Sequence, residues 1–318
     1  GRLTRYRPPA DQTIGEVTVR NDTGVFEGGE ISLHYDPMIA KLITHAPTRE
    51  AAIDAQADAL DAFVIDGVQH NIPFLAALMQ HPRWRDGRLS THFIAEEYPE
   101  GFHPRAAEGA IAMRLAAIAA AIDHIGNKRK RRISGQIVGK PVTFDRRRIV
   151  RLEGAEHRVE VRDEGDVITV AFLDQPADRR PHELVSTWKP GDPVWAGTID
   201  GEAVAAQVRP ILNGVALSHR GVAVRAHVYT EAEAAAARLM PVKSASDVGK
   251  RVLCPMPGLI VSIAVAEGQE VKAGETLAIV EAMKMENVLR AERDGVVKKI
   301  YARPGETLAV DAVILEFA

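Results

Sequence analysis

One lysine of this chain has neighbours and spacing that favour a chemical role. Lys284 stands between Met283 and Met285 in the segment 281–287. An amine displayed on a rigid turn can be acylated by a modifying enzyme and then be reached by other active sites, and the amide bond removes its charge. A solvated hairpin lysine between two core methionines is the simpler interpretation, so the elements around the segment must decide between the two.

An internal repeat surrounds this lysine. The glycines of the repeat fall at turns and its Val, Ile and Leu residues at strand positions, and every pair is 37 residues apart, as from 258 to 295. The repeat predicts a flattened β-sandwich over 251–318, in which 281–287 is the turn that joins the two halves. The matched residues are Gly258, Ile260, Ile263, Gly268, Val271 and Leu277, followed by Gly295, Val297, Ile300, Gly305, Leu308 and Ile314.

The middle of the chain is predicted to combine one long helix with a β-barrel. Apolar residues recur every three or four positions in 105–126, which predicts a central helix that ends at Gly126. From 147 to 230 the period changes to two, and turn residues separate roughly eight short strands, which predicts an antiparallel barrel or sandwich. The helix is apolar enough to suggest a membrane span, but charged residues such as Arg114 and Asp123 favour a core helix that fills the barrel.

The first hundred residues have a mixed α+β pattern. Short strand-like runs come first, and Thr48 is placed to cap a helix with an apolar face. Asn71 and Pro73 are placed to open a second helix. The residues predicted to form the apolar face of the first helix are Ile53, Ala57, Leu60 and Val64.

The predicted fold is therefore multidomain, part α+β and part all-β. A short helix is expected at 231–240, and the polar run after it is expected to be a linker. The predicted division is 1–103 for the first region, 104–240 for the helix and barrel, 241–250 for the linker and 251–318 for the sandwich.

The length, net charge and composition of the chain exclude several classes of protein. A chain of 318 residues exceeds one ordinary core, and a net charge of −3 argues against a general binder of nucleic acids or anionic membranes. The single cysteine, Cys254, excludes an internal disulfide framework, fits a reducing compartment and is predicted to be buried. Histidines such as His34, His70, His157 and His227 show no ligand spacing, so no metal site is predicted here.

Residues 251–318 resemble the biotin-carrying domain of biotin-dependent carboxylases. Ala282-Met283-Lys284-Met285 is the attachment signature of that family, and Pro255-Met256-Pro257-Gly258 matches its usual entry strand. The resemblance implies that a biotin protein ligase attaches biotin covalently to Lys284, with Ala282, Met283 and Met285 as the adjoining site residues. The main rival is a lipoyl domain, which shares the symmetric sandwich, although lipoyl lysines usually follow Asp and precede Ala.

The first 103 residues resemble the C-terminal domain of biotin carboxylases. The resemblance lies in Tyr35–Ile43, in Asp66–Val68 and in His70–Ile72. It implies that an ATP-grasp core, which uses ATP with Mg or Mn, precedes residue 1. The chain by itself is therefore expected not to carboxylate biotin.

Residues 19–24 resemble the family segment whose arginine faces the biotin ring, although Thr18 and Asn21 depart from the usual pattern. The resemblance implies a catalytic role for Arg20, which stabilises the enolate of the ureido group while a ring nitrogen attacks CO2. A surface arginine on a strand is the alternative interpretation.

The order of the three regions resembles the alpha subunits of bacterial propionyl-CoA carboxylases. In that family the middle region is a helix inside an eight-stranded barrel, called the BT domain, which holds the alpha subunit against a carboxyltransferase beta subunit in an alpha6beta6-type assembly. The resemblance implies a ligase in which ATP and bicarbonate carboxylate the biotin on Lys284. The carrier domain then swings to the beta subunit, which transfers the carboxyl group to propionyl-CoA and forms methylmalonyl-CoA.

Several alternatives stay open from the sequence. Acetyl-CoA, 3-methylcrotonyl-CoA or a longer acyl-CoA can replace propionyl-CoA, because nothing in the chain is seen to bind the acyl group. A lipoyl-type or scaffolding carrier ranks lower, because Tyr35–Ile43 argues against it. The basic run 128–132 after the predicted helix is interpreted as a solvated helix exit or a contact with the beta subunit, so neither a nucleic-acid nor a membrane partner is expected. The expected location is the bacterial cytoplasm, or the mitochondrial matrix in a eukaryote.

Overall fold

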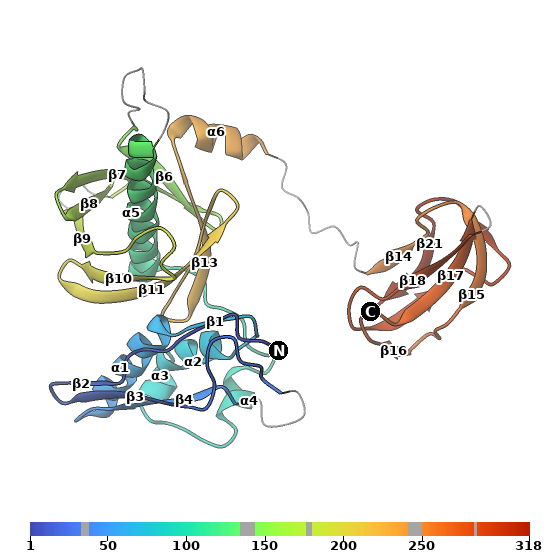
Figure 1. Ribbon diagram of the computed structural model, residues 1–318, viewed down its shortest axis with the longest axis horizontal. Coiled ribbons are helices and arrows are strands. Elements are labelled where there is room, and N and C mark those ends of the chain that lie inside the picture. The colour runs from blue at the N-terminus through green and yellow to red at the C-terminus, as the bar shows by residue number, and fades with distance from the viewer. Residues whose placement is uncertain (33–37, 134–143, 176–179, 241–249, 283–284) are drawn as a thin grey trace. The chain divides into compact units, whose positions relative to one another are not determined.

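The computed structural model describes residues 1–32, 38–133, 144–175, 180–240, 250–282 and 285–318, and its elements are drawn in Figure 1. The chain divides into two compact units, Gly1–Leu239 and Met240–Ala318. The larger unit contains an α+β region and a closed barrel, and the smaller unit contains two four-stranded sheets. The predicted linker, apart from Lys250, lies outside the described residues.

The N-terminal region, residues 1–97, is the predicted α+β fold. Its strands are β1 Arg5–Arg7, β2 Gln12–Ile14, β3 Val17–Thr23, β4 Ala40–His45 and β5 Val64–Asp66, with β2, β3 and β4 in one sheet and β1 paired with β5. Its helices are α1 Arg49–Ala62, α2 Ile72–Met79, α3 Pro82–Arg85 and α4 Phe93–Glu97.

Helix α1 packs on one face of the β2–β3–β4 sheet. Its predicted cap is confirmed, because Thr48 Oγ1 accepts a hydrogen bond from the Ala51 N–H at 3.2 Å. Thr44 of β4 points toward the helix and donates to the Ala52 carbonyl at 2.9 Å. Val64, predicted to belong to the apolar face of this helix, lies instead in β5, because the helix ends at Ala62.

The barrel consists of eight antiparallel strands, as the alternating pattern predicted. Each strand pairs with its neighbours in the closed order β10-β11-β12-β13-β6-β7-β8-β9. The strands are β6 Arg147–Leu152, β7 Ala155–Glu164, β8 Val167–Phe172, β9 His182–Ser186, β10 Val194–Ile199, β11 Glu202–Ile211, β12 Gly214–His219 and β13 Val222–Tyr229. Helix α6, Glu231–Leu239, follows the last strand.

Helix α5, Gly109–Ile133, fills the barrel. Figure 1 shows it in green, running between the barrel strands. Its central residues Leu115, Ala116, Ala117 and Ile118 have no exposed surface and belong to one hydrophobic core with the barrel side chains. The helix is long and apolar enough to cross a membrane. Its burial among the strands makes it the barrel core, and the small alanines let the strands approach its backbone closely.

The predicted bounds of this helix, 105–126, are wrong at both ends. The helix begins at Gly109 and continues through Gly126 to Ile133, so the basic run lies within it and does not follow it. Polar residues around Gly126 find partners that support the extra turns. Asn127 donates to Asp123 at 2.8 Å and Lys128 pairs with Asp163 of β7.

Asp123 forms the innermost polar contact of this helix end. Its carboxylate accepts from Nε of Arg148 on β6 at 3.1 Å, and the arginine side chain is 7% exposed. Burial raises the pKa of the Asp123 carboxyl, and the Arg148 guanidinium opposes that rise. The pair therefore links this end of the helix to the barrel wall.

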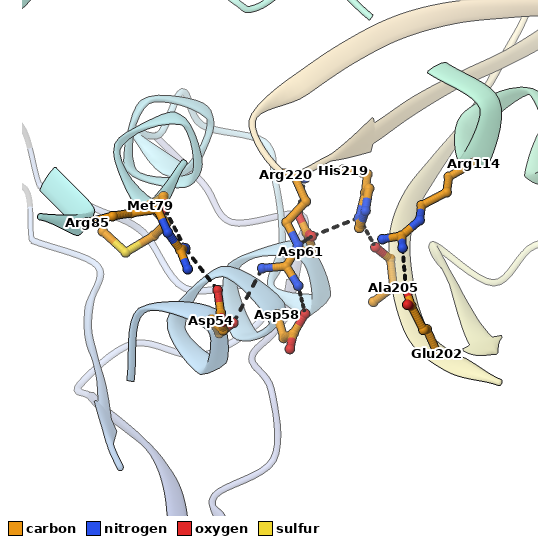
Figure 2. A network of polar contacts seen from close by, with 10 residues as sticks. All are labelled: Asp54, Asp58, Asp61, Met79, Arg85, Arg114, Glu202, Ala205, His219 and Arg220. Atoms are coloured by element: carbon orange, nitrogen blue, oxygen red, sulfur yellow. Dashed lines mark hydrogen bonds and ion pairs between the residues drawn. The ribbon is translucent and has the colours of Figure 1, made fainter. Parts of the chain in front are cut away.

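A buried polar network joins the N-terminal region to the barrel. Figure 2 shows His219 and Arg220, at the turn between β12 and β13, reaching toward Asp61 and Asp58 on α1. His219 Nδ1 lies 2.9 Å from Asp61 Oδ2 and 2.8 Å from the Ala205 carbonyl oxygen. Both neighbours are acceptors, so Nδ1 carries the proton. The Arg220 backbone N–H donates to Asp61 at 2.9 Å.

Gly221, in the same turn, lies directly against α2. Its φ is +76°, and a Cβ at this position would lie 2.6 Å from the Ala77 backbone nitrogen. Only glycine fits both the conformation and the space. The N-terminal region and the barrel therefore meet at a close backbone contact as well as through the polar network.

The smaller unit is the predicted flattened sandwich. Its two sheets have the orders β14-β21-β19-β16 and β18-β17-β15-β20. The strands are β14 Arg251–Leu253, β15 Gly258–Ile263, β16 Glu270–Val271, β17 Thr276–Ala282, β18 Met285–Arg290, β19 Gly295–Ile300, β20 Thr307–Leu308 and β21 Val313–Phe317. The strands of the two halves correspond at the predicted offset, for example β15 with β19 and β17 with β21.

The repeat also explains the sandwich core. Ile260, Leu277, Val297 and Ile314 are fully buried and occupy corresponding places in the two halves. Even an irregularity is repeated, because the pairing register shifts between Ile260 and Ser262 in β15 and between the corresponding residues in β19. The backbone of each half is thus a copy of the other.

Candidate functional site

The β17–β18 hairpin holds the residues predicted to carry the chemistry. The two strands pair in register up to Ala282 and Met285. Met283 and Lys284, which stand between them in the sequence, lie outside the described residues. The hairpin joins the two halves of the repeat as predicted, but most of 281–287 is strand, because Glu281 and Ala282 belong to β17 and 285–287 to β18.

The two described site residues have opposite surroundings. Ala282 is 8% exposed and points toward the sandwich interior, whereas Met285 is 74% exposed. Exposure of Met285 argues against the simpler interpretation of a lysine flanked by two core methionines. An exposed apolar residue beside the predicted attachment position is what a hairpin that enters another protein's active site would present.

Strand β15 packs closely against this hairpin; of the predicted entry strand 255–258, only Gly258 belongs to it, and 255–257 form a bend. A Cβ on Gly258 would lie 2.5 Å from the Glu281 carbonyl oxygen, so glycine lets β15 approach β17 closely. Cys254 is fully buried, as predicted, and its thiol donates to the Met256 carbonyl at 3.0 Å. The hairpin therefore rests on a rigid frame, which an attachment residue needs if it is to be placed reproducibly.

Arg20 lies on β3, on the face of the sheet that points away from α1. Its cross-strand partner is Ile43, whereas the neighbouring pair of Val19 with Thr44 faces the helix. Asp22, two residues along the same strand face, accepts two contacts from the guanidinium: Nε to Oδ1 at 2.9 Å and Nη2 to Oδ2 at 3.1 Å. The Arg20 side chain is 60% exposed. The arrangement fixes the plane of the guanidinium and leaves one edge open to a ligand.

Asp22 is a residue whose role the sequence reasoning missed. An aspartate two positions from an arginine on a strand lies on the same face, and this spacing was the available signal. The carboxylate also offsets the positive charge of Arg20, so the pair orients the arginine at the expense of some electrostatic strength.

Two of the three segments that carried the resemblance of the N-terminal region meet in space. A cavity of about 330 Å³ between β4 and the start of α2 is lined by residues of Tyr35–Ile43 (Met38, Ile39, Ala40 and Leu42) and by His70–Ile72. Burial lowers the pKa of His70, which lines this cavity. The remaining motif residues Tyr35, Asp36 and Pro37 lie outside the described residues.

The larger unit holds one predicted site residue, Arg20. The smaller unit holds the other four, Ala282, Met283, Lys284 and Met285. Among the residues that the structure describes, no group of three or more His, Cys, Asp or Glu side chains is placed to hold a metal ion.

Comparison with protein families divides the chain into three matched segments. Residues 1–96 match the biotin carboxylase C-terminal domain, residues 115–243 the propionyl-coenzyme A carboxylase BT domain, and residues 250–317 the family described as biotin-requiring enzyme. The chain is 47% identical, over its whole length, to the propionyl-CoA carboxylase alpha chain of Ruegeria pomeroyi. The chain belongs to the family of biotin-dependent carboxylase alpha chains. It carries the C-terminal three domains found in that family.

Other relatives extend the comparison. The mitochondrial propionyl-CoA carboxylase alpha chain of Mus musculus is 31% identical over 99% of this chain, and the mitochondrial methylcrotonoyl-CoA carboxylase subunit alpha of the same organism is 25% identical over 95%. The chain spans about half the length of the curated relatives it matches, namely 48% of the Ruegeria protein and 43% of the mouse propionyl-CoA carboxylase protein.

A solved single-chain, multi-domain long-chain acyl-CoA carboxylase is 18% identical over the whole chain. The present chain covers 18% of that protein, with a TM-score of 0.28, which is too low to support a conclusion about the fold.

Proposed function

We propose that this chain is the biotin-carrying part of the alpha subunit of an acyl-CoA carboxylase, with biotin attached to Lys284. The observation that carries the proposal is the match of three consecutive segments to a carboxylase domain, a BT domain and a biotin-requiring domain. The hairpin supports it, because the strands pair up to Ala282 and Met285 and leave only Met283 and Lys284 between them in the sequence.

Attachment is an amide-forming reaction of the lysine. The ε-amine of Lys284, as the free base, attacks the carboxyl carbon of biotin after ATP has activated that carboxyl as an acyl-adenylate. A C–N bond forms, the bond to the adenylate breaks, and the amine loses one proton. The biotin protein ligase that we propose as a partner supplies the activated acid. Bound biotin supplies a ureido nitrogen that accepts and releases a carboxyl group.

Arg20 is proposed as a catalytic residue of the biotin carboxylase site. The support is its place on the open face of the sheet, where Asp22 holds the guanidinium in a fixed plane. A preorganised guanidinium stabilises negative charge that develops in a transition state. In the complete alpha subunit, Arg20→Ala is expected to lower kcat by about 100-fold or more with little change in KM for ATP. An unchanged kcat would rule this role out.

The proposed reaction continues on a separate subunit. The beta carboxyltransferase subunit receives the carboxyl group and transfers it to propionyl-CoA, giving methylmalonyl-CoA, and the assembly is proposed to be of the alpha6beta6 type. Support comes from the propionyl-CoA carboxylase alpha chains of Ruegeria pomeroyi and Mus musculus. Bacterial cytoplasm or the mitochondrial matrix is the proposed location. The division at 103, 240 and 250 is also proposed, supported by the three matched ranges.

Two measurements test the function. Protein from a biotin-competent cell is expected to show, by intact mass, one biotin per chain, which Lys284→Arg removes. A mass increment that fits lipoate, or none, contradicts the proposal. The complete alpha subunit with its beta partner is then assayed against acetyl-CoA, propionyl-CoA, 3-methylcrotonyl-CoA and longer acyl-CoAs. The highest kcat/KM is expected for propionyl-CoA, and a clear preference for another thioester would replace that substrate.

A further inference from the structure

The two halves of the sandwich have the same backbone but different outer faces. On the sheet that contains the hairpin, Val261, Ile279 and Val288 lie side by side across β15, β17 and β18, because Ile279 pairs with Val288 and faces the register shift at Val261. Val261 is 40% exposed and Val288 is 39% exposed. These three residues form an apolar row on the outside of the lysine-bearing sheet.

The corresponding row on the other sheet is ionic. The repeat offset carries Val261 to Lys298, Ile279 to Glu316 and, in the reverse direction, Val288 to Arg251. Lys298 Nζ lies 3.0 Å from Glu316 Oε1, and Arg251 pairs in register with Glu316. The fold therefore accepts charged residues at these three backbone positions, so the sandwich does not need an apolar row there for its stability.

The apolar row lies close to the modified hairpin. Ile279 and Val288 are three register positions from the last described pair, Ala282 with Met285, which is about 10 Å along the strands. Glu281 and Glu286 face each other between the row and the hairpin end, although like charges in direct opposition cost stability. The face thus presents an apolar centre with an acidic end toward the Ala282–Met285 pair.

We infer that this apolar row and its acidic end form the docking surface for the enzyme that attaches biotin to Lys284. The inference rests on the proposed function. The expected occupant has an apolar patch with basic side chains opposite Glu281 and Glu286, which complements the charge of this face.

The chemistry of attachment favours the attaching enzyme over the later active sites. Amide formation brings the lysine amine itself to the activated carboxyl, so the surface of the carrier must be seated directly against the enzyme. The two carboxyl-transferring sites act on the end of a long arm, so the carrier surface can stay farther away. An apolar row about 10 Å from the Ala282–Met285 pair suits a partner that must hold the hairpin itself.

The repeat supplies its own test. In the complete chain, the triple variant Val261→Lys, Ile279→Glu and Val288→Arg replaces the apolar row by the ionic residues found at the corresponding positions of the other sheet. Attachment to this variant is measured with a purified biotin protein ligase, biotin and MgATP, and is followed by intact mass. Its kcat/KM is expected to be about 30-fold lower than that of the parent chain. The matched control, Lys298→Val, Glu316→Ile and Arg251→Val, is expected to stay within about twofold of the parent chain.

Each outcome decides the inference. A folded triple variant that is biotinylated at the parent rate overturns it, as does a larger loss in the control. Normal attachment with slowed carboxyl transfer to the beta subunit would assign the row to the transferase, and loss of a concentration-dependent dimer in sedimentation would assign it to a second copy. Failure of the parent chain to accept biotin contradicts the proposed function instead.

Folding is kept separate from docking. Far-UV circular dichroism and urea unfolding of the smaller unit are compared with the parent chain. If the triple variant unfolds, the single variants Val261→Lys and Val288→Arg, at half-exposed positions, are each expected to lower kcat/KM by about 5-fold without a change in unfolding. Parent rates for both would overturn the inference.

Discussion

The barrel and the sandwich fill their interiors in different ways. The barrel takes its core from α5, which lies outside its strands in sequence, and residues such as Ile118 reach full burial among the barrel side chains. The sandwich takes its core from two copies of one strand pattern, in which Ile260 and Val297 occupy corresponding places. The barrel therefore depends on one continuous helix, whereas each half of the sandwich depends on the other.

This difference suits two different tasks. The barrel is also joined to the N-terminal region by the buried Asp61–His219 contact and by Gly221 against α2, so the larger unit is a stiff body. The sandwich is a small frame with a hairpin at the join of its halves. The first kind of construction suits the proposed role of holding subunits together, and the second suits the proposed presentation of Lys284 to several enzymes.

The largest expected effect breaks the barrel alone. Ile118→Asp buries an unpaired carboxylate in the core of the barrel, which is expected to destabilise the larger unit by more than about 4 kcal/mol. Urea unfolding followed by circular dichroism is expected to lose the transition of the larger unit. Biotinylation of the sandwich, measured by intact mass, is expected to persist. A single transition lost by both units would contradict the separation of the two cores.

The reverse experiment acts on the sandwich. Ile260→Ala is expected to destabilise the smaller unit by about 3 kcal/mol and its repeat partner Val297→Ala by about 2 kcal/mol, because each leaves a cavity in a fully buried place. The larger unit is expected to unfold at its original urea concentration. Equal shifts in both units would show that the sandwich core is not independent.

The join between the N-terminal region and the barrel is tested with two glycines. Gly221→Ala is expected to cost about 2 kcal/mol in the larger unit, since the new Cβ would contact the Ala77 backbone. Gly201 has a φ of +84° but nothing within 4 Å of a Cβ, so Gly201→Ala measures the conformational strain alone, about 1 kcal/mol. Equal costs for the two variants would remove the close contact as a source of stability.

The smallest expected effect concerns the cap of α6. Glu233 accepts from the Thr230 N–H at 2.7 Å, and this bond holds the pKa of its carboxyl below the usual value. A lowered pKa stabilises the fold above the unfolded pKa of about 4.3, and the contribution disappears as the pH falls through the folded value. Glu233→Gln is expected to cost the larger unit less than about 1 kcal/mol at pH 7 and nothing near pH 3. A pH-independent cost would exclude this account.

Periodic features could be predicted from the sequence, and contacts between distant segments could not. The two-residue alternation predicted an antiparallel barrel or sandwich of about eight strands, and the offset repeat predicted the two matching halves of the carrier sandwich. The end of α5 was misjudged at Gly126, because partners such as Asp163, far along the chain, support the helix beyond it. Asp61 and His219 are 158 positions apart, and neither lies in a pattern that would connect them.

The candidate site could be predicted only in part from the sequence. The signature around Lys284 and the arginine of β3 were found from short motifs. Asp22 was visible as a neighbour on the same strand face but was not considered. The apolar row could also be read from the repeat offset, yet its significance needs the strand register, which shows that Val261, Ile279 and Val288 lie on one face.

The sandwich begins and ends at the same place. The Phe317 N–H donates to the Lys250 carbonyl at 2.7 Å, and β14 pairs with β21 along their lengths. An element whose entry and exit strands are adjacent can be inserted into a surface loop of an unrelated protein without pulling that loop open. Residues 250–318 are therefore suited to use as a transplantable cassette that installs a single biotin in the middle of a host chain.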